Sequence, residues 1–136
     1  MKAYDYLLQI RRMDLQIENK LRELEKLKGM KAIVYDADKV QTSVKDSFTD
    51  TMIRISEVNC EINRMINEYV DKKAEVVGVL EKITDPDAYN ILHMYFIQNV
   101  SWNQIHRKKY KDYSYTWVIW KKNEGLRQVE QIIERL

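Results

Sequence analysis

A long run of apolar residues at alternating steps of three and four positions constrains this chain more than any other feature. The run has nine positions, of which eight are apolar or aromatic: Ile55, Val58, Ile62, Met65, Tyr69, Lys72, Val76, Val79 and Ile83. This spacing gathers the side chains into one stripe on an α-helix, and such a stripe needs a helical partner to cover it. Lys72 interrupts the stripe, either at its solvated edge or as a device that fixes the register.

The N-terminal segment provides the nearest partner for this helix. Apolar residues recur there at the same spacing, at Ile10, Met13, Ile17, Leu21, Leu24 and Leu27. The pattern predicts a helix from about Ala3 to Lys28 that ends at Gly29, since glycine favours helix C-termini. Folded back on the longer helix, this segment makes an antiparallel hairpin; the alternative partner is a second copy of the chain. Residues 30–42 show no sustained period, so a linker is expected there, but Ile33, Val34 and Tyr35 could pack back on the helices and the sequence leaves the structure of this segment open.

Composition favours a helical chain outside the membrane. Three Gly and one Pro in 136 residues are too few for the turns of an all-β fold. No stretch approaches the roughly 20 apolar residues of a membrane span, and no signal-peptide core is visible at the N-terminus. Cys60 is the only cysteine, which excludes an internal disulfide. We therefore expect an all-α, cytoplasmic protein with no membrane contact.

A second module is expected to begin at residue 85. Asp85 is a suitable N-cap and Pro86 suits the first helical position, so a new helix starts there. The sequence thus predicts a helical hairpin over residues 1–84, which serves oligomerisation or partner binding. Residues 85–136 are expected to form a separate C-terminal module.

Two N-terminal capping signals follow one another within this module. Ser101 and Gln104 have the spacing of a capping box, and Ser114 repeats the cap thirteen residues later. Two helices joined by a tight connection, the second one longer, are what a helix-turn-helix requires. The second helix is expected to run from Tyr115 to near the C-terminus.

The two sides of this last helix differ in character. One side, with Lys122 as its misfit, is expected to face the protein: Val118, Lys122, Gly125, Leu126, Val129, Ile132 and Ile133. The opposite side presents Thr116, Trp120 and Asn123, flanked by Tyr115, Ile119 and Lys121. Of the two tryptophans in this helix we expect Trp120 to be exposed, where an indole ring can stack on sugar or touch a thymine methyl group. Trp102 is expected in the core.

Four cations within five residues precede the same helix: Arg107, Lys108, Lys109 and Lys111. The last 39 residues hold 8 Lys and Arg against 4 Asp and Glu, whereas the first 97 hold 15 against 17. Cations here are placed to neutralise phosphates, and each contact adds to affinity while steepening its salt dependence. A solvated basic turn is the alternative. Together with the paired caps, the run predicts contact with double-stranded DNA.

These residues carry a resemblance to known families. The segments VSWNQI (100–105) and YSYTWV (113–118), with Leu126, resemble region four of bacterial sigma factors, the helix-turn-helix that reads the promoter −35 element. The whole chain, including YLLQIRR (6–12) and INRMI (62–66), looks like the small Gram-positive phage and prophage proteins related to ArpU-type late transcriptional regulators. The resemblance implies contacts to bases and phosphates from Ser114, Tyr115, Thr116, Trp117, Ile119, Trp120 and Lys121. It further implies that the cytoplasm is that of a bacterial host cell.

The chain departs from the sigma pattern in several places. Ile119 stands where a basic residue is usual, Lys122 stands where the pattern has Leu, and the turn over residues 108–112 is longer. No counterpart of the segment that melts the −10 element is visible. We therefore do not expect this chain to initiate transcription alone.

Nothing in the sequence indicates catalysis. Nucleotide-binding loops, dinucleotide fingerprints and nucleophile elbows are missing, and His93 and His106 lack metal-ligand spacing. We expect no cofactor, metal or small-molecule substrate. The leading expectation is a phage or prophage transcriptional regulator that reads promoter DNA with the helix starting near Tyr115. Its hairpin would form a homo-oligomer, with a dimer favoured, or meet RNA polymerase. The alternatives are a small-terminase-like DNA-packaging protein and a coiled-coil interaction protein that binds no DNA.

Overall fold

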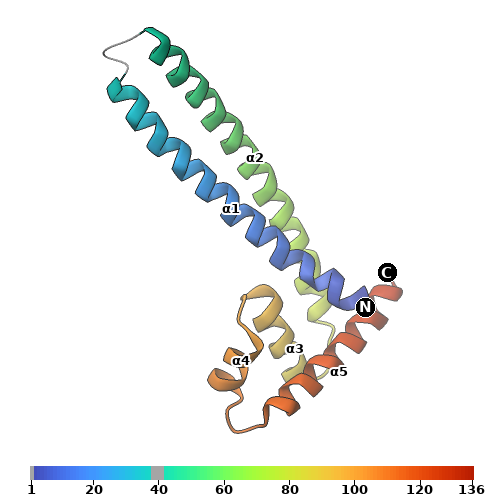
Figure 1. The fold of residues 1–136 in the computed structure, drawn as a ribbon. Helices are drawn as coiled ribbons and strands as arrows, with labels where there is room; N and C mark the ends of the chain where they lie inside the picture. The colour runs from blue at the N-terminus through green and yellow to red at the C-terminus, as the bar shows by residue number, and fades with distance from the viewer. Residues whose placement is uncertain (1, 38–41) are drawn as a thin grey trace. The chain divides into compact units, whose positions relative to one another are not determined.

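The regular elements that the structure describes are all helices (Figure 1). A computed structural model describes residues 2–37 and 42–136. The elements are α1 (Lys2–Ala37), α2 (Thr42–Leu80), α3 (Pro86–Leu92), a π-helical turn η1 (His93–Ile97), α4 (Trp102–Lys109) and α5 (Tyr115–Glu134). Across the described residues there is no strand, which confirms the expected all-α fold. None of the described helices combines the length and the apolar character that a membrane crossing requires.

The first helix is longer than the sequence predicts. We expected α1 to end at Gly29, but it continues to Ala37, so most of the expected linker over residues 30–42 is helical. Residues 38–41 of that linker lie outside the described residues. Gly29 does not stop the helix because glycine ends a helix only when its backbone turns to positive φ, and none of the glycines does so.

The contacts divide the chain into two compact units. One, the terminal unit, comprises Met1–Arg12 and Tyr69–Leu136; the other, the hairpin unit, comprises Met13–Glu68. This division cuts through both long helices and differs from the expected boundary between residues 84 and 85. The reason is that the first turns of α1 and the last turns of α2 share a core with the C-terminal helices. The roles assigned to residues 1–84 and 85–136 stay predictions.

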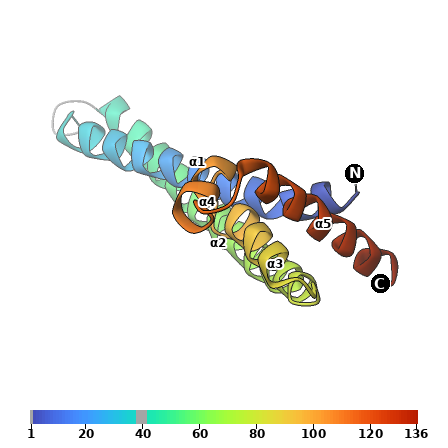
Figure 2. The same ribbon diagram turned by 90° about the horizontal axis from the view of Figure 1, so that it is seen from below.

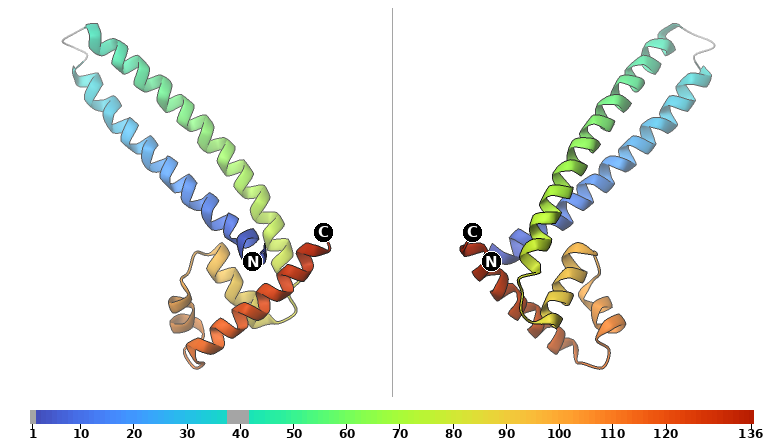
Figure 3. Two further views of the ribbon diagram at one scale, coloured as in Figure 1. Left: turned by 45° about the vertical axis from the view of Figure 1, so that its right-hand side comes forward. Right: turned by 180° about the vertical axis from the view of Figure 1, so that it is seen from behind.

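In the hairpin unit α1 and α2 run antiparallel, side by side (Figures 1 and 3). Their buried contacts join Leu24 of α1 to Ile55, Val58 and Ile62 of α2, so α2 finds a partner within its own chain. Leu21, which we expected in the stripe, is 44% exposed. The buried positions of α1 in this unit, Ile17 and Leu24, are seven residues apart, which leaves Leu21 on the flank of the stripe.

In the terminal unit α3, α4 and α5 gather around the ends of the long helices (Figures 1 and 2). The core of this unit is formed by the start of α1, the end of α2, α3, η1 and α5. Its buried residues are Ala3, Leu7, Ile10, Val76, Val79, Leu80, Ile83, Ala88, Leu92, Phe96, Ile97, Leu126 and Val129. Trp102 at the start of α4 packs against this core and stacks on Tyr95, with ring centroids 3.6 Å apart. Trp102 therefore packs inward, as expected. This core fixes the helices that carry the candidate site.

The three C-terminal helices begin where the sequence predicts. The Asp85 carboxylate accepts hydrogen bonds from the backbone N–H groups of Asp87 and Ala88, and Pro86 opens α3. The Ser101 hydroxyl accepts from the N–H of Gln104 at 3.3 Å, and the Ser114 hydroxyl accepts from that of Trp117 at 3.0 Å. Each cap satisfies donors that the first helical turn leaves unpaired, so the starts of α3, α4 and α5 are set locally.

Candidate nucleic-acid interface

A small core holds α4 and α5 in a fixed relation. It consists of Ile91 of α3, Ile105 of α4, Tyr110 of the connecting turn and Val118 of α5. The Tyr110 hydroxyl accepts a hydrogen bond from the Asn90 side-chain amide at 2.9 Å. Burial raises the pKa of Tyr110, so its hydroxyl stays protonated. The cations around Tyr110 are evident from the sequence, but no local pattern indicates that Tyr110 anchors the turn.

The turn itself is braced from both sides. A nitrogen of the His106 ring, Nε2, lies 2.7 Å from the carbonyl oxygen of Tyr113; since a carbonyl can only accept, the ring donates. The Tyr113 ring stacks on Trp117, with centroids 4.0 Å apart and planes inclined by 16°. These contacts set the direction in which α5 leaves the turn. His106 thus has a positioning role that its spacing did not reveal.

The inner side of α5 is packed as the sequence predicts. Val118, Gly125, Leu126 and Val129 are buried. The misfit Lys122 is explained by its neighbour, because its ammonium lies 5.1 Å from the centre of the Trp102 ring, within the range of a cation–π contact.

The outer side of α5 faces solvent. Tyr115, Thr116, Trp120 and Asn123 are exposed, and Ile119 is half-buried. Trp120 is 54% exposed, which confirms the expectation for this residue. Trp117, which the sigma resemblance places at the interface, is half-buried against the turn instead. The outer side is therefore formed by residues of the first turns of α5, and Trp117 is not one of them.

Lys121 lies beside the outer side, as expected, with its ammonium 5.1 Å from the centre of the Trp120 ring. The same ammonium also pairs with the Asp85 carboxylate at 2.5 Å, and the side chain is only 16% exposed. The hydrogen bond from Lys121 lowers the pKa of Asp85, and the same bond raises the pKa of Lys121. Glu124 lies 3.7 Å from the same ammonium. Lys121 thus ties α5 to the start of α3.

The four predicted cations remain available. Arg107, Lys108, Lys109 and Lys111 are all exposed. Within the described parts of the chain, no ion pair joins any of them to a carboxylate. The segment from residue 101 to residue 123 holds six Lys and Arg against one Asp. The surface of α4, the turn and the start of α5 is therefore strongly basic.

A shallow depression lies on this basic surface. It has a volume of about 340 Å³ and is lined by Asn103, His106 and Arg107 of α4 and by Tyr115 of α5. Amide, guanidinium and phenol groups at one place are suited to hydrogen-bond phosphate oxygens. The depression joins the basic run to the outer side of α5.

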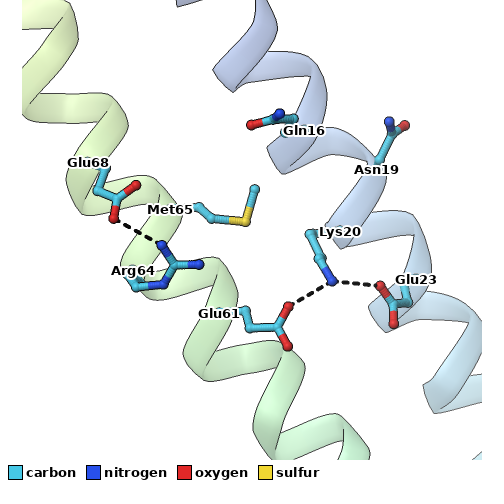
Figure 4. Close-up of a pocket in the computed structure, with 8 residues that line it drawn as sticks. All are labelled: Gln16, Asn19, Lys20, Glu23, Glu61, Arg64, Met65 and Glu68. Atoms are coloured by element: carbon cyan, nitrogen blue, oxygen red, sulfur yellow. Dashed lines mark hydrogen bonds and ion pairs between the residues drawn. The ribbon is translucent and has the colours of Figure 1, made fainter.

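A second depression, on the hairpin unit, has a different character (Figure 4). Its volume is about 480 Å³, and its charged groups pair with one another. Lys20 lies 2.7 Å from Glu61 and 3.2 Å from Glu23, and Arg64 lies 3.0 Å from Glu68. Because these charged side chains pair with one another, we interpret this surface as a structural contact between α1 and α2.

Comparison with known proteins gives one match. The model of the family described as "Protein of unknown function (DUF1492)" matches residues 30–130. No curated protein and no solved structure matches the chain.

Proposed function

This chain belongs to the DUF1492 family, and for this member we propose a non-enzymatic role as a DNA-binding transcriptional regulator of the phage or prophage type. The proposed partner is double-stranded DNA in the bacterial cytoplasm, read by α5. The hairpin is proposed to form a homodimer or to meet RNA polymerase. The regulatory part of the proposal rests on the resemblance to sigma region four.

The observation that carries the proposal is the exposed outer side of α5 beside four exposed cations. The major groove of B-DNA is about 12 Å wide and admits an α-helix. The caps, the small core and the His106 contact hold α5 rigidly, so little ordering is needed on binding. A solvated basic turn would explain the cations, but it would not explain the exposed aromatic side chains beside them.

The predicted site residues divide into three groups by their surroundings. We assign phosphate contacts to the free cations Arg107, Lys108, Lys109 and Lys111. We assign the groove-facing positions to Ser114, Tyr115, Thr116, Ile119, Trp120 and Asn123. Trp117 and Lys121 act as positioning residues, because each is already engaged within the protein.

A titration of the full-length chain with duplex DNA at two salt concentrations tests the proposal. We expect affinity to fall steeply as salt rises, because bound phosphates release counterions. Reversal of Lys108, Lys109 and Lys111 to Glu is expected to weaken binding to every sequence. It is also expected to reduce the slope of log affinity against log salt by about 1 for each lysine.

A matched control carries the same change in charge at another place. Arg22, Lys26 and Lys28 are exposed on the hairpin unit, and their reversal to Glu is expected to retain most of the affinity and the salt slope. Absent binding, or binding that ignores salt, would leave a coiled-coil interaction protein. Light scattering addresses the packaging alternative, because a closed ring of many subunits would favour packaging over regulation.

A further inference from the structure

The outer side of α5 carries an exposed aromatic and apolar surface inside a basic region. Tyr115 is 41% exposed and Trp120 is 54% exposed. Residues three and four positions apart are neighbours on a helix, so Thr116 lies beside Trp120, and Ile119 lies between Tyr115 and Asn123. This side of the helix therefore offers two exposed aromatic rings, with apolar carbons of Ile119 and Thr116 and the Asn123 amide between them.

Over residues 115–124 of α5, the charged groups that could read bases are engaged within the protein; the next cation on this side of the helix is Arg127. Guanine is typically read by Arg or Lys, and cytosine by Asp or Glu. The only charged residues from 115 to 124 are Lys121, Lys122 and Glu124. The two ammonium groups are engaged with Asp85 and with the Trp102 ring, and one carboxylate oxygen of Glu124 is buried near Lys121.

The groups that remain match the major-groove face of A·T pairs. Threonine methyl, isoleucine and aromatic carbons make apolar contacts with the C5-methyl group of thymine, and an asparagine amide pairs with N6 and N7 of adenine. Thr116, Ile119 and Trp120 supply the first kind of contact, and Asn123 supplies the second. From this we propose that α5 selects A·T-containing sites through thymine methyl groups, an inference that rests on the proposed DNA binding.

The flanking charge fits the same ligand. Arg107, Lys108, Lys109 and Lys111 lie before the outer side in the chain and are exposed. A protein partner with an apolar surface would make no favourable contact with these cations. The phosphates on either side of the major groove would, because the cations neutralise their charge. DNA therefore accounts for both the apolar and the basic part of the surface.

The test removes the methyl groups and nothing else. Duplexes bound by the full-length protein are first recovered from a random pool. The best one is then made with deoxyuridine in place of thymidine, which keeps base pairing and the other groove groups. We expect recovered sequences rich in A·T pairs. We also expect about fourfold weaker binding for each contacted methyl group that is lost, the value for one buried CH₂ group.

Two variants test whether the difference in affinity between the thymidine and deoxyuridine duplexes depends on Thr116. Thr116→Ser keeps the hydroxyl and removes only the methyl, so we expect a smaller ratio between the thymidine and deoxyuridine affinities. Lys108→Gln is the matched control: it is expected to weaken both duplexes equally and to leave the ratio unchanged. A ratio that falls equally in both variants would contradict the role of Thr116.

The outcomes separate this inference from the proposed function. If no duplex is bound, the proposed function fails and this inference fails with it. If duplexes are bound with equal affinity for thymidine and deoxyuridine, or if G·C-rich sequences are enriched, DNA binding stands and selection through thymine methyl groups is overturned.

Discussion

At the scale of single residues, Asp85 joins two helices. Its carboxylate caps α3 and also pairs with Lys121 of α5. The hydrogen bond from Lys121 is the main reason that the pKa of Asp85 is lowered. A carboxyl with a lowered folded pKa contributes stability above its unfolded pKa of about 4, and this contribution is lost as the pH falls through the folded value.

The substitution Asp85→Asn removes the ion pair with Lys121 but keeps the helix cap, because Asn caps a helix about as well as Asp. The variant should be less stable by about 1 kcal/mol at neutral pH, as for a weak ion pair. Its unfolding free energy should depend less on pH below about 4. Urea unfolding across a pH series measures both. An unchanged acid profile would show that the pair with Lys121 does not persist in solution.

His93 gives a second, separable pH effect. Burial lowers its pKa, with a smaller contribution from the nearby charge of Lys73. As the pH falls, the His93 imidazole is therefore protonated at a higher pH in the unfolded chain than in the folded protein. Stability is lost as the pH falls from about 6.5 to the lower folded pKa. His93→Gln should flatten the profile in this higher window and leave the Asp85 window unchanged, which distinguishes the two groups in the same unfolding series.

At the scale of elements, α5 approaches α3 closely at one glycine. A Cβ atom on Gly125 would lie 2.8 Å from Cδ1 of Leu92 and 3.3 Å from Cβ of Ala88. Both neighbours are fully buried, so neither can move into solvent. The contact between the two helices therefore depends on the missing side chain, and the outer side of α5 depends on this contact for its position.

Alanine substitutions at two helical glycines test this packing. Gly125→Ala is expected to destabilise the protein by about 1–3 kcal/mol through overpacking, partly offset by better helix propensity. Gly78 in α2 has nothing within 4 Å of the corresponding Cβ position, so Gly78→Ala should stabilise by about 0.5–1 kcal/mol. Thermal unfolding of both variants gives the comparison. Equal shifts of the same sign would contradict the close approach at Gly125.

At the scale of the whole molecule, the terminal unit is built from both ends of the chain. Leu7 of α1 and Val76 of α2 share a core with Phe96 and Leu126. The Tyr6 hydroxyl also donates a hydrogen bond to Glu75 at 2.8 Å, which links α1 to α2 within this unit. The C-terminal helices alone therefore lack a complete core.

Two shortened chains test this dependence. A fragment of residues 85–136 should lose cooperative thermal unfolding, because its apolar surface would be exposed to water. A chain in which a short Gly-Ser loop joins Arg12 to Tyr69 keeps the whole terminal unit, so it should unfold cooperatively and, by the proposed function, bind DNA. Circular dichroism during heating compares them. Cooperative unfolding of the fragment would show that residues 85–136 are a domain by themselves.

Features that depend on near neighbours were predictable from the sequence. The caps at Asp85, Ser101 and Ser114 depend only on the next few residues. The helical period of α5 places Trp120 on the solvent side and Val118 on the buried side. The cations of the candidate site belong to the same class, because a charged run next to a cap is exposed by default. Their proposed role in DNA binding stays a prediction.

The tertiary structure alone decided which surfaces and charges meet. The partner of Lys121 is Asp85, 36 positions away, and no local pattern indicates that pair. The sharing of one core between the start of α1, the end of α2 and the C-terminal helices was likewise invisible. Periodicity determines which face of a helix is apolar, but the covering surface depends on how all the apolar faces of the chain are buried together.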